Sequence, residues 1–137
     1  MALDPSHVLD SEALAHFIFE SSKIRGDGTV HHRALMPSIK TGNKSVFRIN
    51  NLTDAEISGT GQAEVGDPQA RVMLGWARLL AARVREQKLT VRPDEPPLRH
   101  ALIEGWSTSV EEQRLAAMAL AQNAQFAAQM RRDDSNR

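Results

Sequence analysis

The sequence contains no cysteine. A chain without thiols forms no disulfide, has no thiolate nucleophile and cannot bind zinc through cysteine. This composition fits a reducing compartment, and we expect a cytoplasmic protein. Long apolar runs are also missing, whereas a membrane-spanning helix needs roughly 20 apolar residues. The first residues, MALDPSHVLDSEALAHF, have neither the basic start nor the apolar core of a secretory signal. We therefore expect no membrane partner.

An excess of positive charge is absent as well. The chain has 17 basic and 17 acidic side chains, so its formal net charge is zero. Dedicated nucleic-acid-binding domains usually carry a basic excess, and this balance disfavours that class. A local basic patch would still allow a nucleic acid or a nucleotide as a partner.

What is present indicates one small domain. A chain of 137 residues is long enough to bury roughly two-thirds of its unfolded surface in a single core. Asp4-Pro5 interrupts regular structure near the start. We predict a flexible segment over 1–12, one domain over 13–130 and a disordered tail over 131–137.

Residues 14–50 have the pattern of β-strands. LAHFIFESSKIR contains aromatic and β-branched residues, which favour a strand. GDG at 26–28 is typical of a tight hairpin turn. TVHHRALM alternates along its length, and SVFRI is a third short candidate. These features predict a three-stranded antiparallel meander.

Residues 67–87, DPQARVMLGWARLLAARVREQ, have the clearest helical period. Asp67 suits the N-cap, with Pro68 at the first helical position. Met73, Trp76 and Leu80 recur at spacings of three and four, which predicts a buried stripe. We expect Trp76 and Leu80 to pack against the meander.

The other elements are shorter or less certain. Thr53 and Glu56 have the spacing of a capping box and predict a helix start, as do Ser109 and Glu112. KLTVRP and LRHALIEGW are strand candidates. The helix that begins after Ser109 is expected to run through RLAAMALAQNAQFAAQM, with one face formed by Leu115, Met118, Ala119, Phe126 and Met130. The predicted fold is α+β, a small antiparallel meander packed against two longer α-helices.

One stretch, VRPDEPPLRHALIEGW at 91–106, concentrates groups that can do chemistry. His100 titrates near neutrality and is a candidate catalytic acid or base. Arg99 presents a planar fork suited to phosphate, and Asp94 can orient the histidine. Arg48, Arg25 and His32 from the meander are the candidates that would complete a ligand-binding site. The structural alternative is that Asp94, Glu95 and Arg99 pair across the loop while His100 packs on Trp106.

No metal or cofactor is predicted. His31 and His32 are adjacent, and neighbouring strand residues face opposite sides, so they cannot both bind one ion from a strand. Arg71, Arg78 and Arg85 recur every seven residues, and in one helix they would form a row able to follow a nucleic-acid backbone or simply face solvent.

The Ala-rich helix predicted near the C-terminus offers a surface for association. Small side chains let another helix approach closely, either from the same chain or from another one. We therefore consider a protein partner, or a second copy of this chain, bound through that helix.

Two segments together resemble a family of small uncharacterised bacterial proteins. They are KSVFRINNLTDAEI and LTVRPDEPPLRHALIEGW, followed by the Ala-rich helix. The shared features are the SVFR and DEPPxRHAxIxGW patterns, and the resemblance covers residues from about 13 to 128. It implies that both segments belong to one domain, with Ser45 to Arg48 and Arg99-His100 as joint site candidates. It implies no activity.

The sequence therefore supports two functions. The first is a small cytosolic interaction or accessory protein that acts with a macromolecular partner. The alternative is a metal-independent enzyme or a binding domain for a phosphorylated ligand, such as a nucleotide or RNA, that uses an Arg/His cluster. The second requires Arg48, Arg99 and His100 to converge on one concave surface.

Overall fold

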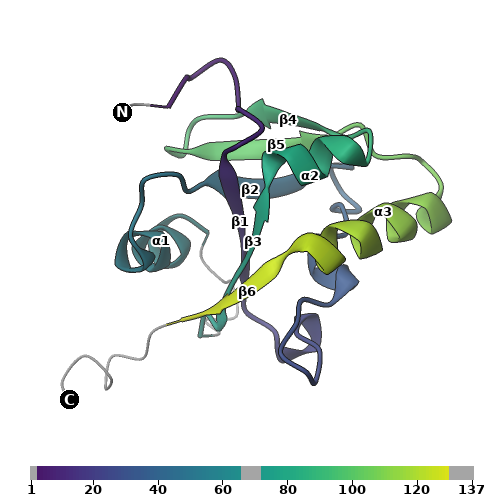
Figure 1. The fold of residues 1–137 in the computed structure, drawn as a ribbon, viewed down its shortest axis with the longest axis horizontal. Coiled ribbons are helices and arrows are strands. Elements are labelled where there is room, and N and C mark those ends of the chain that lie inside the picture. The colour runs from purple at the N-terminus through teal and green to yellow at the C-terminus, as the bar shows by residue number, and fades with distance from the viewer. Residues whose placement is uncertain (1–2, 66–71, 130–137) are drawn as a thin grey trace.

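The computed structural model describes residues 3–65 and 72–129 and has the predicted α+β architecture (Figure 1). All strands within these ranges belong to one antiparallel sheet of six strands in the order β4-β5-β2-β1-β3-β6. The strands are β1 (Ala13–Ile18), β2 (Lys44–Arg48), β3 (Gly75–Leu80), β4 (Thr90–Pro93), β5 (His100–Glu104) and β6 (Gln125–Ala128). The helices are α1 (Asp54–Thr60), α2 (Ala81–Glu86) and α3 (Val110–Asn123), with 3₁₀ turns η1 (Ser21–Lys23) and η2 (His32–Leu35) and a π turn η3 (Gly61–Val65).

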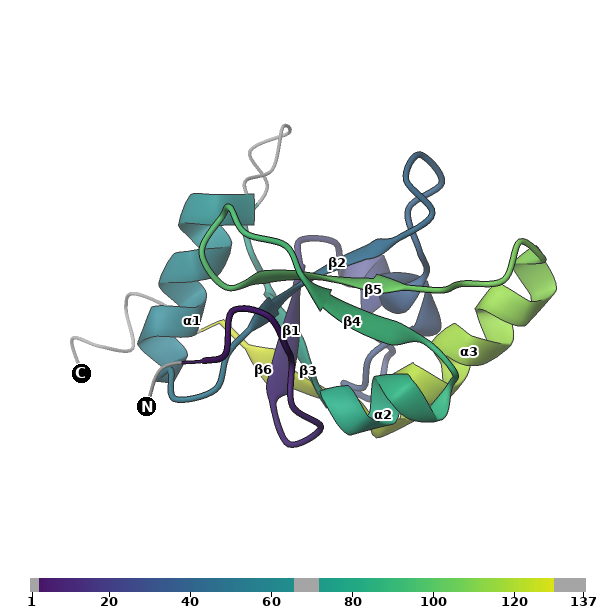
Figure 2. The same ribbon diagram turned by 90° about the horizontal axis from the view of Figure 1, so that it is seen from above.

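The sheet consists of two halves joined by a short ladder between β1 and β2. That ladder pairs Leu14 with Arg48 and Ala15 with Phe47. Beyond it, β1 continues alongside β3, and β2 continues alongside β5. Figures 1 and 2 both show β4 and β5 running at a steep angle to β1 and β3. The segment 19–43, which holds η1 and η2, connects the ends of β1 and β2 where they part.

Each face of the sheet has its own core. On one face, η2, α2 and α3 cover Leu14, Val46 and Ile103, with Leu120 among the helical contributions. On the other face, Ile57 of α1 packs with residues from β1, β2 and β3; these include Phe17, Phe47 and Trp76. The rings of Phe17 and Trp76 meet edge to face at 6.4 Å. Which face a strand residue occupies therefore decides what it can reach.

Several predicted elements are confirmed. Thr53 and Glu56 form a reciprocal capping box at the start of α1. The Ser109 hydroxyl accepts a hydrogen bond from the Glu112 amide at the start of α3. KLTVRP and LRHALIEGW supply β4 and β5, which pair with each other. None of the helices within the described ranges is long and apolar enough to cross a membrane.

The meander predicted over 14–50 is only partly correct. TVHHRALM is not a strand: Val30 makes a single bridge to Ile24, and His32–Leu35 form η2. The nitrogen Nδ1 of His31 accepts a hydrogen bond from the Arg33 amide and caps this turn. Val30 and Leu35 still become buried, because the turn packs against α3. Burial of this segment against a helix replaced the strand pairing that the alternation suggested.

The long helix predicted over 67–87 is also wrong. Within the described part of that range, Gly75–Leu80 form β3, and α2 begins only at Ala81. Trp76 is buried as expected, but Leu80 is 36% exposed. The residues of this stretch fit both a helical period and an alternating one. Pairing with β1 on one side and β6 on the other selects the strand.

The C-terminal helix is shorter than predicted. α3 ends at Asn123, the backbone becomes extended at Ala124, and Gln125–Ala128 form β6 beside β3. The buried side of α3 is Ala117, Leu120 and Ala121, whereas Leu115 and Met118 are exposed. Leu115, Met118 and Ala119 lie in α3, but Phe126 lies in β6, so the predicted apolar face does not extend that far; Met130 and the predicted tail lie outside the described residues.

The segment 3–12, for which flexibility is expected, lies against the sheet. Val8 belongs to the core, and Glu12 is buried. These contacts bring the N-terminal segment to Arg48, one of the predicted site residues.

Candidate functional site

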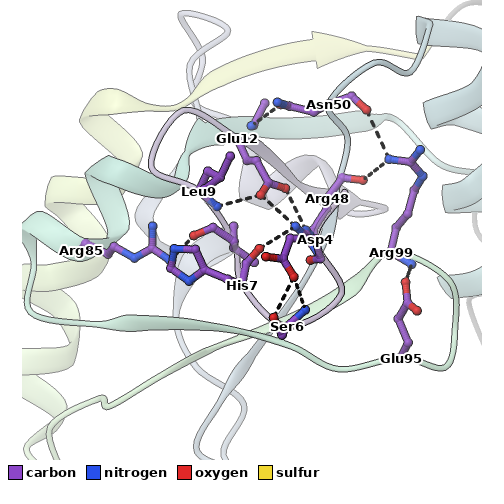
Figure 3. A network of polar contacts seen from close by, with 12 residues as sticks. Asp4, Ser6, His7, Leu9, Glu12, Arg48, Asn50, Arg85, Glu95 and Arg99 are labelled. Atoms are coloured by element: carbon purple, nitrogen blue, oxygen red, sulfur yellow. Dashed lines mark hydrogen bonds and ion pairs between the residues drawn. The ribbon is translucent and has the colours of Figure 1, made fainter. Parts of the chain in front are cut away.

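Arg48 is the most completely bonded of the predicted site residues (Figure 3). Its Nε and Nη2 atoms donate to the two carboxylate oxygens of Glu12, both at 2.8 Å. Its remaining contacts are to backbone: Nη1 donates to the Asp4 carbonyl at 2.7 Å and Nη2 to the His7 carbonyl at 3.0 Å. The side chain is buried. Arg48 therefore joins β2 to the N-terminal segment, with its guanidinium donors directed at Glu12 and at backbone carbonyls; its role in binding a phosphorylated ligand stays a prediction.

Glu12 is a true ionic partner in this pair. Burial by itself raises the pKa of its carboxyl group, but the hydrogen bonds from Arg48 and from the Leu9 amide, with the guanidinium charge, outweigh burial and hold the pKa below its usual value. A second arginine, Arg85, anchors the same segment through the Asp10 carboxylate at 2.6 Å and the Val8 carbonyl. These contacts explain how the first residues are held against the sheet.

Asp94 and His100 form a local pair at the start of β5. The nitrogen Nδ1 of His100 lies 3.0 Å from the Asp94 carbonyl oxygen and 3.2 Å from its Oδ2. Because both neighbours are acceptors, Nδ1 carries the proton. The imidazole, whose side chain is 13% exposed, packs on the ring of Phe47 at 5.3 Å. His100 thus packs on Phe47 rather than on Trp106, whose indole N–H donates to the Ile103 carbonyl.

Arg99 closes the same loop. Its backbone has φ of 71°, its amide donates to the Glu95 carboxylate at 2.8 Å, and its guanidinium donates to the Asn50 carbonyl at 3.2 Å. The peptide bonds before Pro96 and Pro97 are both cis. Figure 3 shows Arg99 reaching from this loop toward the chain that follows β2.

The predicted residues do not form one site. β2 and β5 pair Phe47 with His100, so His100 shares a face with Phe47, and Arg48 points to the opposite face. Arg25 and His32 lie on the α3 side, where Val30 and Leu35 join the core beneath α3. An acid/base role for His100 remains a prediction, but the sheet separates it from three of its predicted partners.

Arg25 and His32 line the same hollow, which has a volume of about 460 Å³ and lies between the 25–32 segment and the C-terminal part of α3. The 25–32 side also contributes Asp27, Thr29 and His31. Met118 and Gln122 line it from α3. His31 and His32 stack with ring centroids 4.4 Å apart, because the 3₁₀ turn removes the opposed orientation they would have in a strand.

The electrostatics of this hollow favour anions. Burial, and then the charges of Arg33, His32, Arg25 and Lys23, lower the pKa of His31. Burial and the charges of Arg114 and Arg33 lower the pKa of His32 in the same way. Both rings are therefore neutral at neutral pH, within a positive potential. The Asp27 carboxylate accepts two hydrogen bonds from Thr29, and the Arg25 guanidinium has no hydrogen bond or ion pair to another described residue.

Beside the hollow, α3 presents apolar side chains to solvent. Leu115 is 58% exposed and Met118 is 41% exposed, and Val110 is exposed at the start of the helix. We call Leu115 and Met118 together the α3 apolar pair. Met118 belongs both to this pair and to the lining of the hollow.

The helical row of arginines considered from the sequence fails on geometry. Arg78 lies in β3 and Arg85 in α2, so they form no helical row; Arg71 falls outside the described residues. Among the residues that the structure describes, no group of three or more His, Asp or Glu could hold a metal ion.

The sequence analysis missed His31, Gln122 and Met118 as members of the hollow. The stacking of His31 on His32 depends on a turn that looked like a strand, and Met118 was assigned to the apolar face of the C-terminal helix. Its exposure beside the hollow follows from how α3 packs and left no sign in the sequence.

No family model, curated protein or solved structure matches this chain. The resemblance through the SVFR and DEPPxRHAxIxGW segments therefore stays a prediction.

Proposed function

We propose that this protein acts by binding a macromolecular partner, a protein, at the hollow and the adjoining α3 apolar pair. The observation that carries the proposal is that Met118, which lines the hollow, and Leu115, three residues before it in α3, are both exposed, and that the charged surroundings of the hollow are mainly basic. Large apolar side chains beside a cavity are typical of protein-binding surfaces, where a few buried anchors supply most of the affinity.

The chemistry of the partner follows from the lining. Arg25, Arg33 and Arg114 lie close enough to the two imidazoles to lower their pKa values. Asp27, the acidic group of the lining, is engaged with Thr29. The complementary partner segment would carry an apolar side chain for the hollow and a carboxylate nearby.

A second candidate is favoured by Arg25 and the stacked histidines. An unpaired guanidinium next to two imidazoles also suits the phosphate of a small ligand, including a nucleotide. Here the α3 apolar pair would contribute little, and Arg25 would be decisive. The two candidates therefore predict different responses to substitution.

The experiment compares the full-length chain with Met118→Asp, Arg25→Glu and, as a matched control, Ile39→Asp, since Ile39 is fully exposed elsewhere. Each is used to capture proteins from the source organism, and a captured protein is then purified and its affinity measured. The proposal expects that Ile39→Asp binds normally and that Met118→Asp weakens binding at least tenfold. Equal affinity for all variants would refute it.

The small-ligand candidate is tested in parallel by thermal shift with a panel of phosphorylated compounds. A stabilisation that Arg25→Glu abolishes and Met118→Asp leaves intact would favour that candidate over the partner. If the panel has no effect on the unmodified chain, the second candidate fails.

A further inference from the structure

The place where β1 and β2 part brings together basic groups that neither candidate function uses. After Ala15 and Phe47 the two strands are no longer paired with each other. There, Nδ1 of His16 lies 3.4 Å from the Ser45 carbonyl oxygen of β2. Lys44 begins β2 on the same face as Val46, and η1, which contains Lys23, follows β1. A histidine and two lysines thus come from three elements, β1, η1 and β2.

Lys44 stands out because its charge is not compensated. Its side chain is partly buried, and it makes no hydrogen bond or ion pair with another described residue. Three arginines in or beside the sheet behave differently, since each has an acceptor; Arg78, for which no acceptor is found among the described residues, is exposed on β3. Arg48 bonds to Glu12, Arg92 to Glu104 and Arg99 to backbone carbonyls. The only fully buried polar side-chain atom without a partner in the described ranges is Oε1 of Gln129, so the Lys44 ammonium keeps some contact with solvent.

The charges that act on Lys44 are of its own sign. Burial, and then the positive charge of Lys23, lower the pKa of the Lys44 ammonium to about 8. Burial also lowers the pKa of His16 well below its usual value, with further contributions from Lys44 and Lys23 and an opposing one from the Ser45 carbonyl. No carboxylate contributes to either shift. A charged group withdrawn from water and facing another cation destabilises the fold unless an anion offsets it.

From this arrangement we infer that Lys44 and Lys23, beside His16, form a binding site for a small anionic group, a phosphate or a carboxylate, where β1 and β2 part. Lys44 supplies the charge and up to three donors, and Lys23 supplies a second charge. His16 borders the site without donating to the anion, because the one N–H of its neutral ring, at Nδ1, faces the Ser45 carbonyl oxygen. An anion bound there would offset the repulsion between Lys44 and Lys23, which no described carboxylate offsets. The inference does not rest on the proposed function, because none of the three residues lines the hollow.

Anion binding and protonation of Lys44 are thermodynamically linked, so the site can be tested on the unmodified chain. An anion that binds the ammonium form of Lys44 better than the amine form must raise the pKa of Lys44. The full-length chain, labelled with ¹³C at lysine Cε, is titrated by NMR in sodium chloride and in sodium phosphate at equal ionic strength. In saturating phosphate we expect a rise of about one pKa unit at Lys44, which corresponds to a tenfold preference for the charged form. Binding of phosphate should weaken as pH rises above about 8.

Controls separate a site from general screening. Lys40 lies exposed in the turn before β2 and should show no phosphate-specific shift. A third titration in sodium acetate identifies the class: a rise in phosphate alone indicates phosphate esters, and a rise in both salts indicates anions in general. Lys23→Met should reduce the rise at Lys44.

The inference is overturned if the pKa of Lys44 shifts no more in phosphate or acetate than that of Lys40. Such a result would leave the proposed function standing, because that function depends on Met118 and Arg25. Conversely, loss of partner binding in Met118→Asp with an intact phosphate response would separate the two surfaces.

Discussion

Replacing Arg48 with methionine should destabilise the protein by about 3–5 kcal/mol, the usual effect of removing one partner of a buried ion pair. The structure explains the size of the effect. Glu12 would keep only the Leu9 amide as a donor, and the Asp4 and His7 carbonyls would lose their guanidinium donors. For a chain of this length the melting temperature should fall by roughly 10–20 °C. Urea unfolding followed by circular dichroism measures the difference.

The pH dependence gives an independent check. In the unmodified chain the pKa of Glu12 is lowered, so its contribution to stability is present above the usual carboxyl pKa and is lost as pH falls below it. In Arg48→Met, burial is less strongly opposed and the pKa of Glu12 should rise, which destabilises the variant as pH increases toward neutrality. The stability difference between the two proteins should therefore be large near pH 7 and should shrink toward about pH 4.5.

Two further variants isolate the cause. Glu12→Gln combined with Arg48→Met removes both charges and should recover much of the loss, because no uncompensated buried charge remains. Arg83→Met removes an exposed pair with Glu86 and should change stability by less than about 1 kcal/mol. The reasoning is refuted if Arg48→Met is as stable as Arg83→Met, or if the double variant is no more stable than the single one.

Other expected outcomes concern the core, the sheet edge and acid stability. Trp76→Ala should cost about 3–5 kcal/mol in denaturant titration, because the indole is buried between β1 and α1 residues; a loss under about 1 kcal/mol would contradict its assignment to the core. Gly75→Ala should expose β6 amides to hydrogen exchange, since an added Cβ would lie 2.1 Å from the Ala127 carbonyl oxygen. Gly59→Ala, with open space around it, serves as the control, and equal protection of β6 in both variants would disprove the clash. Lowered pKa values at His16, His31 and His32 mean that the unfolded chain takes up protons first as pH falls below about 6.5. Stability should therefore decline from about pH 7.5 to 5.5, and an increase over that range would refute these shifts.

The extent of correct prediction differs between elements for identifiable reasons. The start of α1 and the strands β4 and β5 were predictable, because capping and short alternating strands depend on nearby residues. β3 was not, since its sequence fits a helix equally well until β1 and β6 pair with it. The end of α3 was unpredictable for the same reason. The Ala-rich sequence continues past Asn123, but pairing with β3 makes Gln125–Ala128 a strand.

The candidate site shows the same division. Arg25 and His32 were identified from the sequence and do lie together, although the geometry that stacks His31 on His32 came from a turn that was not predicted. Arg48 and His100 were identified as partners, yet the pleat sends them to opposite faces of the sheet.

The sequence by itself determined the absence of thiol chemistry, the balanced charge and the α+β class. It also determined those helix starts and strands that depend on neighbouring residues. Tertiary structure alone decided which cations are compensated. Arg48 and Lys44 lie four residues apart in one strand and face the same side. Arg48 meets Glu12, brought to it by the fold of the N-terminal segment, whereas Lys44 meets Lys23 and lies near His16 where the strands part. The free energy of a buried charge depends on its neighbours in space, and long-range pairing determines which neighbours those are.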